Sequence, residues 1–236
     1  MLRRVAITFA YYWLGRVRKS LLRWAVYFLV ALYGTCALVL LSLKVFSPPS
    51  TSVRLQRQLE AFFTARPYTE QSTFVPLHRI DPHLIQAVVA AEDARFFHHY
   101  GIDWVELQKV FAASWRQGRF VRGGSTITQQ LMKNLFLTTY GSVFRKALEL
   151  TLAPLAELLL SKERILELYL NVVEWGPGVY GAAAAARYHY GLSARHLSRG
   201  QAARLAACLP APRTRIPQRM DYLSAEILDR MQSMGR

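Results

Sequence analysis

The sequence predicts a mainly α-helical protein that carries one membrane-spanning helix near its N terminus. Through most of the chain after residue 80, apolar residues recur every three or four positions, which is the period of an amphipathic helix. No stretch shows the strict alternation of apolar and polar residues that predicts β-strands. Residues 24–43 form one uncharged, apolar run. The 52% share of apolar residues excludes a disordered or low-complexity chain.

The apolar run is long enough to cross a bilayer, whose core needs about 20 apolar residues in a helix. Trp24 and Tyr27, with Arg23 and Lys44 at the flanks, are typical of a membrane interface. A buried core helix is the alternative, but core helices that are apolar all round are seldom this long. A cleaved signal peptide would have a shorter apolar region of about 7–15 residues, so we expect an uncleaved anchor.

The charge distribution predicts the orientation of this anchor. The segment before it contains no acidic residue and six basic ones: Arg3, Arg4, Arg16, Arg18, Lys19 and Arg23. Because basic flanks stay in the cytoplasm, we expect a single-pass protein of the inner (cytoplasmic) membrane with a cytoplasmic N terminus and a periplasmic main part. The whole chain has a net charge of +15, so the main part stays basic after the six N-terminal basic residues are subtracted. A basic part suits a membrane surface or a pyrophosphate substrate. Nucleic acid is not an expected partner, because the sequence has no nucleic-acid-binding motif.

We divide the chain into four segments. Residues 1–23 form a basic cytoplasmic segment, 24–43 the transmembrane anchor, 44–74 a linker and the start of the domain, and 75–236 a single exported domain. Two cysteines are too few for a disulfide scaffold or a cysteine-based zinc site.

Helix signals recur along the exported domain. Asp81-Pro82 is a good helix start, with Asp as the N-cap and Pro at the first helical position. Pro154 is expected to kink or divide the helix in which it lies. Further helices are expected at 126–137, 143–160, 162–173, 181–187 and 198–208.

Glu92 is the first candidate for chemistry. At helical spacing it shares a face with Val88 and Phe96, which places a carboxylate inside an apolar stripe. Burial raises the pKa of a carboxyl group, and a raised pKa suits a general base near neutral pH. A helix-end glutamate that turns to solvent is the alternative. The nearby His98-His99 pair has no further His or Cys at ligand spacing, so a structural role is favoured over metal ligation.

Residues 123–134 predict a glycine loop that enters a helix. Thr126 and Gln129 have the spacing of a capping box, and the free amides of such a helix start attract phosphate. An ordinary capped amphipathic helix is the alternative, and the spacing excludes a Walker P-loop. The helix has a polar face that suits a pyrophosphate, formed by Thr126, Gln130, Lys133 and Asn134.

Arg145 and Glu149 have the i, i+4 spacing of a helical ion pair. A surface pair that contributes about 0.3–0.5 kcal/mol is the simpler interpretation. In the functional interpretation, Glu149 is a second carboxylate opposite Glu92, and Arg145 and Lys146 are available for phosphate.

The segment that begins at Lys162 has the apolar stripe of a scaffold helix. Three glycines after it, Gly176, Gly178 and Gly181, match the dinucleotide pattern G-x-G-x-x-G. That fingerprint must follow a strand, and here a helix is expected before it, so we do not assign a nucleotide site.

In their order along the chain, these segments resemble the peptidoglycan glycosyltransferase family, which polymerises lipid II, in its membrane-anchored form without a transpeptidase domain. The pattern E-D-x-x-F-x-x-H-x-G falls on Glu92, Asp93, Phe96, His99 and Gly101. The pattern G-G-S-T-x-T-Q-Q-x-x-K-N falls on residues 123–134. R-K-x-x-E falls on Arg145, Lys146 and Glu149, and K-x-x-I-L-E-x-Y-L-N begins at Lys162. The resemblance covers roughly residues 75–215.

The resemblance implies a lysozyme-like head with a small membrane-facing jaw at 104–122. It implies that Glu92 takes the proton from the acceptor's GlcNAc 4-hydroxyl, and that Glu149 is the second catalytic carboxylate. Lys133 and Arg145 would neutralise the leaving pyrophosphate. A divalent cation, Mg²⁺ or Mn²⁺, is a candidate cofactor without a metal ligand assigned in the chain, and no organic cofactor is expected. The other motif residues would bind substrate: Asp93, Phe96, His99, Gly101, Ser125, Thr126, Gln130, Asn134, Lys146 and Lys162.

Two positions depart from the family's pattern. Leu192 stands where the family commonly has Lys, and Gln201 stands where it commonly has Glu. Both lie outside the motifs assigned to chemistry, so they affect packing or substrate contacts and not the reaction type.

Two other functions stay open from the sequence. A lytic muramidase would use the same carboxylates but would need neither Lys133, Arg145 nor a membrane anchor. A non-catalytic anchored scaffold would tolerate replacement of Glu92 and Lys133. The expected partners are lipid II, the growing lipid-linked glycan, the membrane, and proteins of cell-wall synthesis and division.

Overall fold

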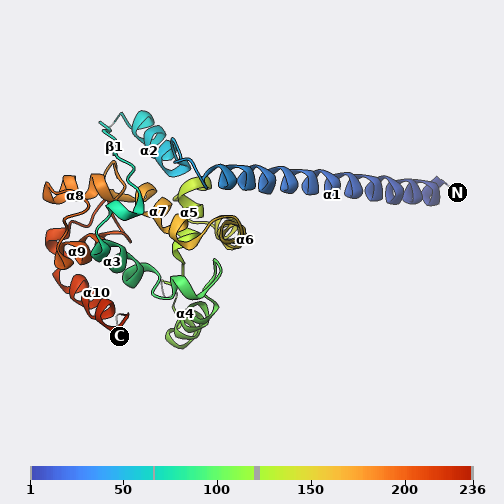
Figure 1. Ribbon diagram of the computed structural model, residues 1–236. Coiled ribbons are helices and arrows are strands. Elements are labelled where there is room, and N and C mark those ends of the chain that lie inside the picture. Colours follow the sequence, from blue (N-terminus) through green and yellow to red (C-terminus); the bar gives the residue numbers. More distant parts are fainter. Residues whose placement is uncertain (1, 66, 120–122, 235–236) are drawn as a thin grey trace.

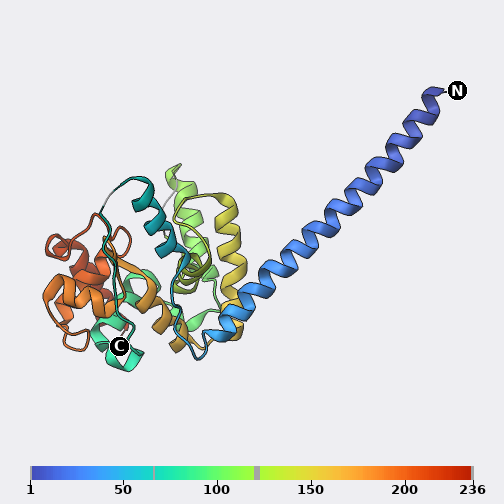
Figure 2. The same ribbon diagram turned by 90° about the horizontal axis from the view of Figure 1, so that it is seen from above.

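One helix covers the predicted cytoplasmic segment from residue 2 and the predicted anchor as far as residue 42. In the computed structural model, which describes residues 2–65, 67–119 and 123–234, α1 (Leu2–Ser42) projects away from the rest of the chain, the head (Figures 1 and 2). Its stretch Lys19–Ser42 has the length and apolar composition to cross a membrane. Most apolar side chains of that stretch are exposed, which suits contact with lipid. The helix is therefore compatible with the predicted single-pass anchor.

The C-terminal end of α1 packs against the head. Cys36, Leu40 and Leu43 are buried in the core, and the hydroxyl of Tyr33 forms a hydrogen bond with the hydroxyl of Thr151.

Arg164 binds the last carbonyl groups of this helix region. Its Nε donates to the carbonyl of Leu43 at 2.7 Å, and its Nη2 donates to the carbonyl of Phe46 at 2.7 Å. Carbonyls at the end of a helix have no partner within the helix, so a basic side chain from the head satisfies them. The anchor thus joins the head through defined contacts.

The described part of the head contains nine further helices and several short 3₁₀ turns. The helices are α2 (Ser52–Phe63), α3 (Pro82–Glu92), α4 (Trp104–Gln117), α5 (Ile127–Phe136), α6 (Val143–Leu159), α7 (Lys162–Val172), α8 (Ala182–Tyr190), α9 (Arg199–Cys208) and α10 (Asp221–Met234). The 3₁₀ turns are η1 (Leu77–Arg79), η2 (Phe96–His98) and η3 (Pro217–Arg219).

Helix α7 forms the centre of the head. It packs on α5, which in turn packs on α2 and α6, while α3, α9 and α10 pack on one another (Figure 1). The apolar stripe predicted for this helix is confirmed, and its buried residues are Ile165, Leu166, Leu168, Tyr169, Leu170, Asn171 and Val172.

The predicted helix start at Asp81-Pro82 is confirmed, but Pro154 does not divide its helix. The Asp81 carboxylate accepts a hydrogen bond from the His83 N–H at the start of α3. Pro154 lies inside α6, which continues past it to Leu159.

A small three-stranded sheet is present that the sequence did not predict. β1 (Gln71–Ser72) pairs in parallel with β3 (Val179–Tyr180), and β3 pairs antiparallel with β2 (Glu174–Gly176). Strands of two or three residues are too short to show an alternating pattern in a sequence. The glycines that match the dinucleotide pattern lie in and after the β2–β3 hairpin, which follows α7, and Gly178 has a φ of +74° in its turn.

Both ends of the head hold more structure than expected. Residues 44–74, expected as a linker and the start of the domain, contain α2 and β1, and α2 packs on α5. At the other end, α10 packs on α3 and α9 and places Ile227 and Met231 in the core.

Helix α4 occupies the region predicted as the jaw. Its large apolar side chains are exposed, at 63% for Trp104, 69% for Phe111 and 81% for Trp115. Such a surface suits a membrane interface. Phe120 and Arg122, which belong to the same predicted region, lie outside the described residues.

We expect Gly101 to tolerate no side chain. Its φ is +82°, and a Cβ there would lie 2.7 Å from the carbonyl carbon of Ala153 and 2.8 Å from the nitrogen of Pro154. Gly101→Ala should lower the free energy of unfolding by about 3 kcal/mol, through backbone strain and displacement of α6. Gly118→Ala is the control, because φ is +59° there but a Cβ meets nothing within 4 Å. It should lower the free energy by only about 1 kcal/mol. Denaturation of the full chain in detergent measures both, and equal losses would contradict the predicted clash.

Candidate active site

Glu92 ends α3, and its side chain is half-buried. Gln130 Nε2 donates a hydrogen bond of 2.6 Å to Glu92 Oε2. Burial raises the pKa of Glu92, while the hydrogen bond from Gln130 and the charges of Lys133 and Arg215 oppose that rise. The raised pKa agrees with the property predicted for a general base at this position.

Tyr169 fixes the orientation of the Gln130 amide. It is fully buried in α7, and its hydroxyl donates to Gln130 Oε1 at 3.0 Å. Because the amide oxygen accepts from the phenol, the NH₂ group is directed toward Glu92. The hydrogen-bonded series Tyr169–Gln130–Glu92 thus connects α7, α5 and α3.

Phe96 does not share a helix with Glu92, contrary to the expected stripe. Helix α3 ends at Glu92, and Phe96 lies fully buried in η2. The Nζ of Lys162 lies 4.3 Å from the centroid of the Phe96 ring and 2.7 Å from a carboxylate oxygen of Glu157. Both residues therefore make packing contacts inside the fold, and their role as substrate-binding residues stays a prediction.

Asp93 holds the start of α5. Its carboxylate accepts from the N–H of Ile127 at 3.0 Å and from His99 Nε2 at 3.0 and 3.1 Å. Asp93 and His99 are buried. The backbone amide that the sequence predicted to attract phosphate is therefore already bound to a carboxylate of the protein. This observation favours a structural role for Asp93 and His99.

Asp93, His99 and Asp103 also offer ligand atoms within 4.8 Å of one another. However, Asp103 pairs with Arg95 at 3.1 Å and accepts from the N–H of Glu106 at 3.0 Å. A metal ion here would displace hydrogen bonds that already satisfy both carboxylates. The group therefore fits a hydrogen-bond network better than a metal site.

Thr126 is the N-cap of α5. Its hydroxyl accepts from the N–H of Gln129 at 3.2 Å and donates to the carbonyl of Gly101 at 2.6 Å. Only half of the predicted capping box is present, because the Gln129 side chain accepts instead from Lys146 at 3.0 Å.

Lys133 is half-buried on α5, and its side-chain ammonium has no hydrogen bond or ion pair with the residues that the structure describes. Burial and the charge of Arg145 lower its pKa, and Glu92 raises it, so Lys133 lies within electrostatic range of both. The adjacent Asn134 is buried and donates to the backbone carbonyl of Gln130 at 2.8 Å. Of the predicted polar face, only Gln130 and Lys133 take part in the site around Glu92.

Glu149 holds two cations on α6. It is buried and pairs with Arg145 and, at 3.0 Å, with Lys146. Lys146 Nζ also donates to Ser125 Oγ at 2.7 Å. Burial, followed by the charges of Arg145 and Lys133, lowers the pKa of Lys146 to about 8 despite its contact with Glu149. We call Lys133, Arg145 and Lys146 the cationic cluster.

Two arginines that the sequence did not single out extend this positive field. Arg215 lowers the pKa of Glu92, and Arg57 on α2 lowers the pKa of Lys133. Arg215 follows α9, and its Nη1 donates to the carbonyl of Ala207 at 2.8 Å. Both arginines lie far from the motifs along the chain, and no local pattern marks them.

These residues provide two complementary functions. A carboxylate with a raised pKa is able to accept a proton from a hydroxyl group, and an adjacent group of cations is able to bind and stabilise a departing anion. This combination fits glycosyl transfer from a donor with a phosphorylated leaving group.

Comparison with known sequences decides the family. The sequence model described as transglycosylase matches residues 57–234. The chain belongs to the transglycosylase family. The match begins within α2, which agrees with the packing of that helix on the head. The predictions of the family, of an enzyme and of a mainly α, lysozyme-like fold are confirmed.

Named relatives are similar over most of this transglycosylase. It is 48% identical over 179 residues to the biosynthetic peptidoglycan transglycosylase of Pseudomonas entomophila, which covers 76% of this chain and 75% of the relative. Proteins of the same name are 49% identical over 166 residues in Methylobacillus flagellatus and 52% identical over 162 residues in Dechloromonas aromatica. These matches cover 70% and 67% of this chain and 72% and 70% of the respective relatives.

We expect replacement of Gln130 to shift the pH dependence of this transglycosylase. Gln130→Met removes the donor to the Glu92 carboxylate, so the pKa of Glu92 should rise further. The acidic limb of the pH–rate profile should move to higher pH by about one unit, because a hydrogen bond to a charged group contributes about 1.5 kcal/mol. Gln218→Met on the exposed turn η3 is the control and should leave the limb in place. An unchanged limb in Gln130→Met would show that Glu92 is not the titrating group.

Proposed function

We propose that this transglycosylase polymerises peptidoglycan glycan strands by transferring the growing glycan from undecaprenyl pyrophosphate to lipid II. The observation that supports this most directly is the placement of Glu92, with its raised pKa, beside the cationic cluster. The relatives' names, which specify peptidoglycan biosynthesis, agree with it.

In this reaction Glu92 acts as the general base. It takes the proton from the 4-hydroxyl of the acceptor's GlcNAc as that oxygen attacks C1 of the donor's MurNAc. The bond from C1 to the α-linked pyrophosphate breaks, and a β-1,4 bond forms with inversion at C1. Gln130 acts as a positioning residue, because it orients the Glu92 carboxylate through a hydrogen bond.

The cationic cluster balances the charge of the leaving group. A pyrophosphate that departs from a site with little water needs positive charge more than it needs a proton donor. Lys133 suits this role best, since its ammonium makes no hydrogen bond or ion pair with the described part of the chain. Glu149 acts as a positioning residue that holds Arg145 and Lys146 side by side.

We propose that any Mg²⁺ or Mn²⁺ in the reaction arrives with the pyrophosphate and is not held by the protein alone. Such ions prefer several carboxylate or carbonyl oxygens. The Glu149 carboxylate is already paired with two cations, and the Glu92 carboxylate accepts from Gln130 close to Lys133. These residues do not fit a resident ion.

We further propose that α1 crosses the inner membrane once, with residues 1–23 in the cytoplasm and the head in the periplasm. The excess of basic residues before the span and the exposed apolar surface of α4 support this orientation. Contacts with proteins of cell-wall synthesis and division stay a prediction.

The function is tested with the full chain in detergent and labelled lipid II. Glu92→Gln should lower the polymerisation rate by at least about 100-fold, the usual contribution of a general base, without weakening lipid II binding. Glu149→Gln should weaken lipid II binding instead, because Arg145 and Lys146 lose their partner. Glu163→Gln, at an exposed position on α7, is the matched control and should behave as wild type. Polymerisation at the wild-type rate by Glu92→Gln would contradict the assigned base.

The same preparations distinguish the alternative functions. A muramidase would solubilise isolated cell-wall sacculi in the absence of lipid substrate. A scaffold would neither polymerise lipid II nor solubilise sacculi, and cells would tolerate Glu92→Gln. Adding EDTA to the polymerisation assay, followed by Mg²⁺, tests whether the pyrophosphate needs an accompanying cation.

We expect Lys146 to set the basic limb of the pH–rate profile. Its pKa of about 8 means that it is charged below that pH and neutral above it, so the cationic cluster loses one charge as the pH rises through 8. Activity should therefore fall in that range. Lys146→Arg stays protonated throughout this range, so the fall in activity near pH 8 should disappear. Lys109→Arg on the exposed surface of α4 is the control. A basic limb that stays near pH 8 in Lys146→Arg would contradict this assignment.

A further inference from the structure

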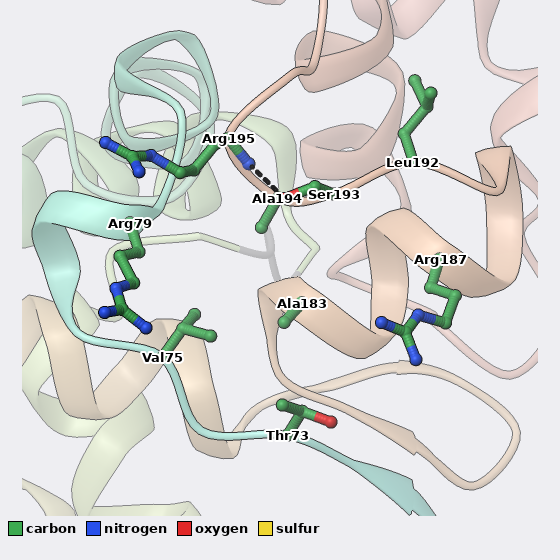
Figure 3. A pocket seen from close by; sticks show the side chains of 9 residues that line it. All are labelled: Thr73, Val75, Arg79, Ala183, Arg187, Leu192, Ser193, Ala194 and Arg195. Carbon is green, nitrogen blue, oxygen red and sulfur yellow. Dashed lines mark hydrogen bonds between the residues drawn. The ribbon is translucent and has the colours of Figure 1, made fainter.

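A pocket of about 370 Å³ lies outside the site around Glu92. Its walls come from the segment before α3, from helix α8 and from the loop that follows α8 (Figure 3). The proposed reaction uses none of the side chains that line it.

Three arginines surround this pocket, and no acidic residue lines it. Figure 3 shows Arg79 and Arg187 on opposite sides of Val75 and Ala183, with Arg195 on the same side as Arg79. None of the three guanidinium groups has an ion pair or a hydrogen bond with any residue that the structure describes. Three unpaired positive charges around one hollow attract an anion with more than one negative group.

The rest of the lining is apolar or carries a hydroxyl. Val75, Ala183 and Leu192 provide aliphatic surface, while Thr73 and Ser193 provide hydroxyl groups. Leu192 is one of the two positions that depart from the family's pattern, and as leucine it adds apolar surface where a lysine would add a fourth cation. The pocket therefore suits a ligand that combines short aliphatic groups with several carboxylates.

Backbone hydrogen bonds hold the walls of the pocket in place. The N–H of Asp81 donates to the carbonyl of Ala194 at 2.7 Å, and the N–H of Leu192 donates to the carbonyl of Ala186 at 3.2 Å. A site whose backbone is fixed in advance loses less entropy when a ligand binds.

Helix α7 separates this pocket from Glu92. Asn171 Oδ1 accepts from the N–H of Val75 at the pocket, whereas Tyr169 donates to Gln130 beside Glu92. Residues two apart on a helix point to nearly opposite sides. A ligand in the pocket therefore lies away from the bond that is being formed.

We propose that this pocket binds the carboxylates of a short peptide carried by the glycan. This inference rests on the proposed function, because a peptidoglycan strand is by definition a glycan that bears peptides. Guanidinium groups bind carboxylates in a two-pronged geometry, and small aliphatic side chains fit the apolar lining. A free phosphate would use the arginines but would leave the aliphatic surface without a partner.

The test measures peptide binding to the full chain in detergent by calorimetry. The probes are N-acetyl-Ala-Glu-Glu-Ala, which has three carboxylates, the uncharged N-acetyl-Ala-Gln-Gln-Ala amide, and inorganic phosphate. We expect the acidic peptide to bind at least tenfold more tightly than either other probe. Arg79→Gln, Arg187→Gln and Arg195→Gln should each weaken its binding about tenfold, the effect of losing one charge-assisted hydrogen bond. Arg219→Gln, an exposed arginine on η3, is the matched control and should change nothing.

Polymerisation of lipid II is measured on the same samples, so that the two proposals fail separately. The acidic peptide should raise the KM for lipid II in wild type and should lose this effect when the three pocket arginines are replaced together. The inference would be overturned if the acidic peptide did not bind, if the three variants bound it as tightly as wild type does, or if phosphate bound more tightly than the peptide. Each of these outcomes would leave the polymerase assignment intact. Loss of polymerisation by wild type would instead overturn the proposed function.

Discussion

The site depends on a carboxylate that is held partly out of water. Glu92 ends a helix in the core of the head, and burial makes its charged form unfavourable unless a donor compensates. Gln130 supplies that donor, and its orientation depends on the phenol of Tyr169 in the most buried helix. The packing of α3, α5 and α7 is therefore also the device that sets the basicity of Glu92. A change in that packing affects stability and reactivity together.

The distribution of the remaining charges follows from the same constraint. Glu149 neutralises part of the charge of Arg145 and Lys146, which allows two cations to stay close together in a partly buried place. Lys133 has no such partner in the described residues, so its charge remains available to an incoming anion. The site therefore contains a base, Glu92, then a cation without a counter-ion, Lys133, and then two cations, Arg145 and Lys146, that share the counter-ion Glu149. This order matches the order of charges in a reaction that removes a proton on one side and releases a pyrophosphate on the other.

Much of this could be predicted from the sequence, because a helix that buries one face must repeat its apolar residues at a helical period. That rule located α7 and the helix that leads to Glu92, but it wrongly continued this helix to Phe96. It could not tell which polar side chains are used within the fold, since their partners lie far along the chain. Asp93, Thr126 and Lys162 belong to motifs but bind to the protein itself. Arg215 faces Glu92 without any motif, because only the folded chain brings α9 next to α3.

Helix α6 links the chemistry to the anchor. Thr151 on this helix contacts Tyr33 of α1, whereas Glu149, two residues earlier and so on nearly the opposite side, binds the cationic cluster. One helix, about 10 Å in diameter, therefore separates the anchor from the cluster. Tyr33 lies about 15 Å along the helix before Leu43, so α6 contacts α1 near the middle of the predicted span 24–43. Arg164 binds the carbonyl groups at the end of α1 as well, so the cationic cluster keeps a defined position relative to the anchor.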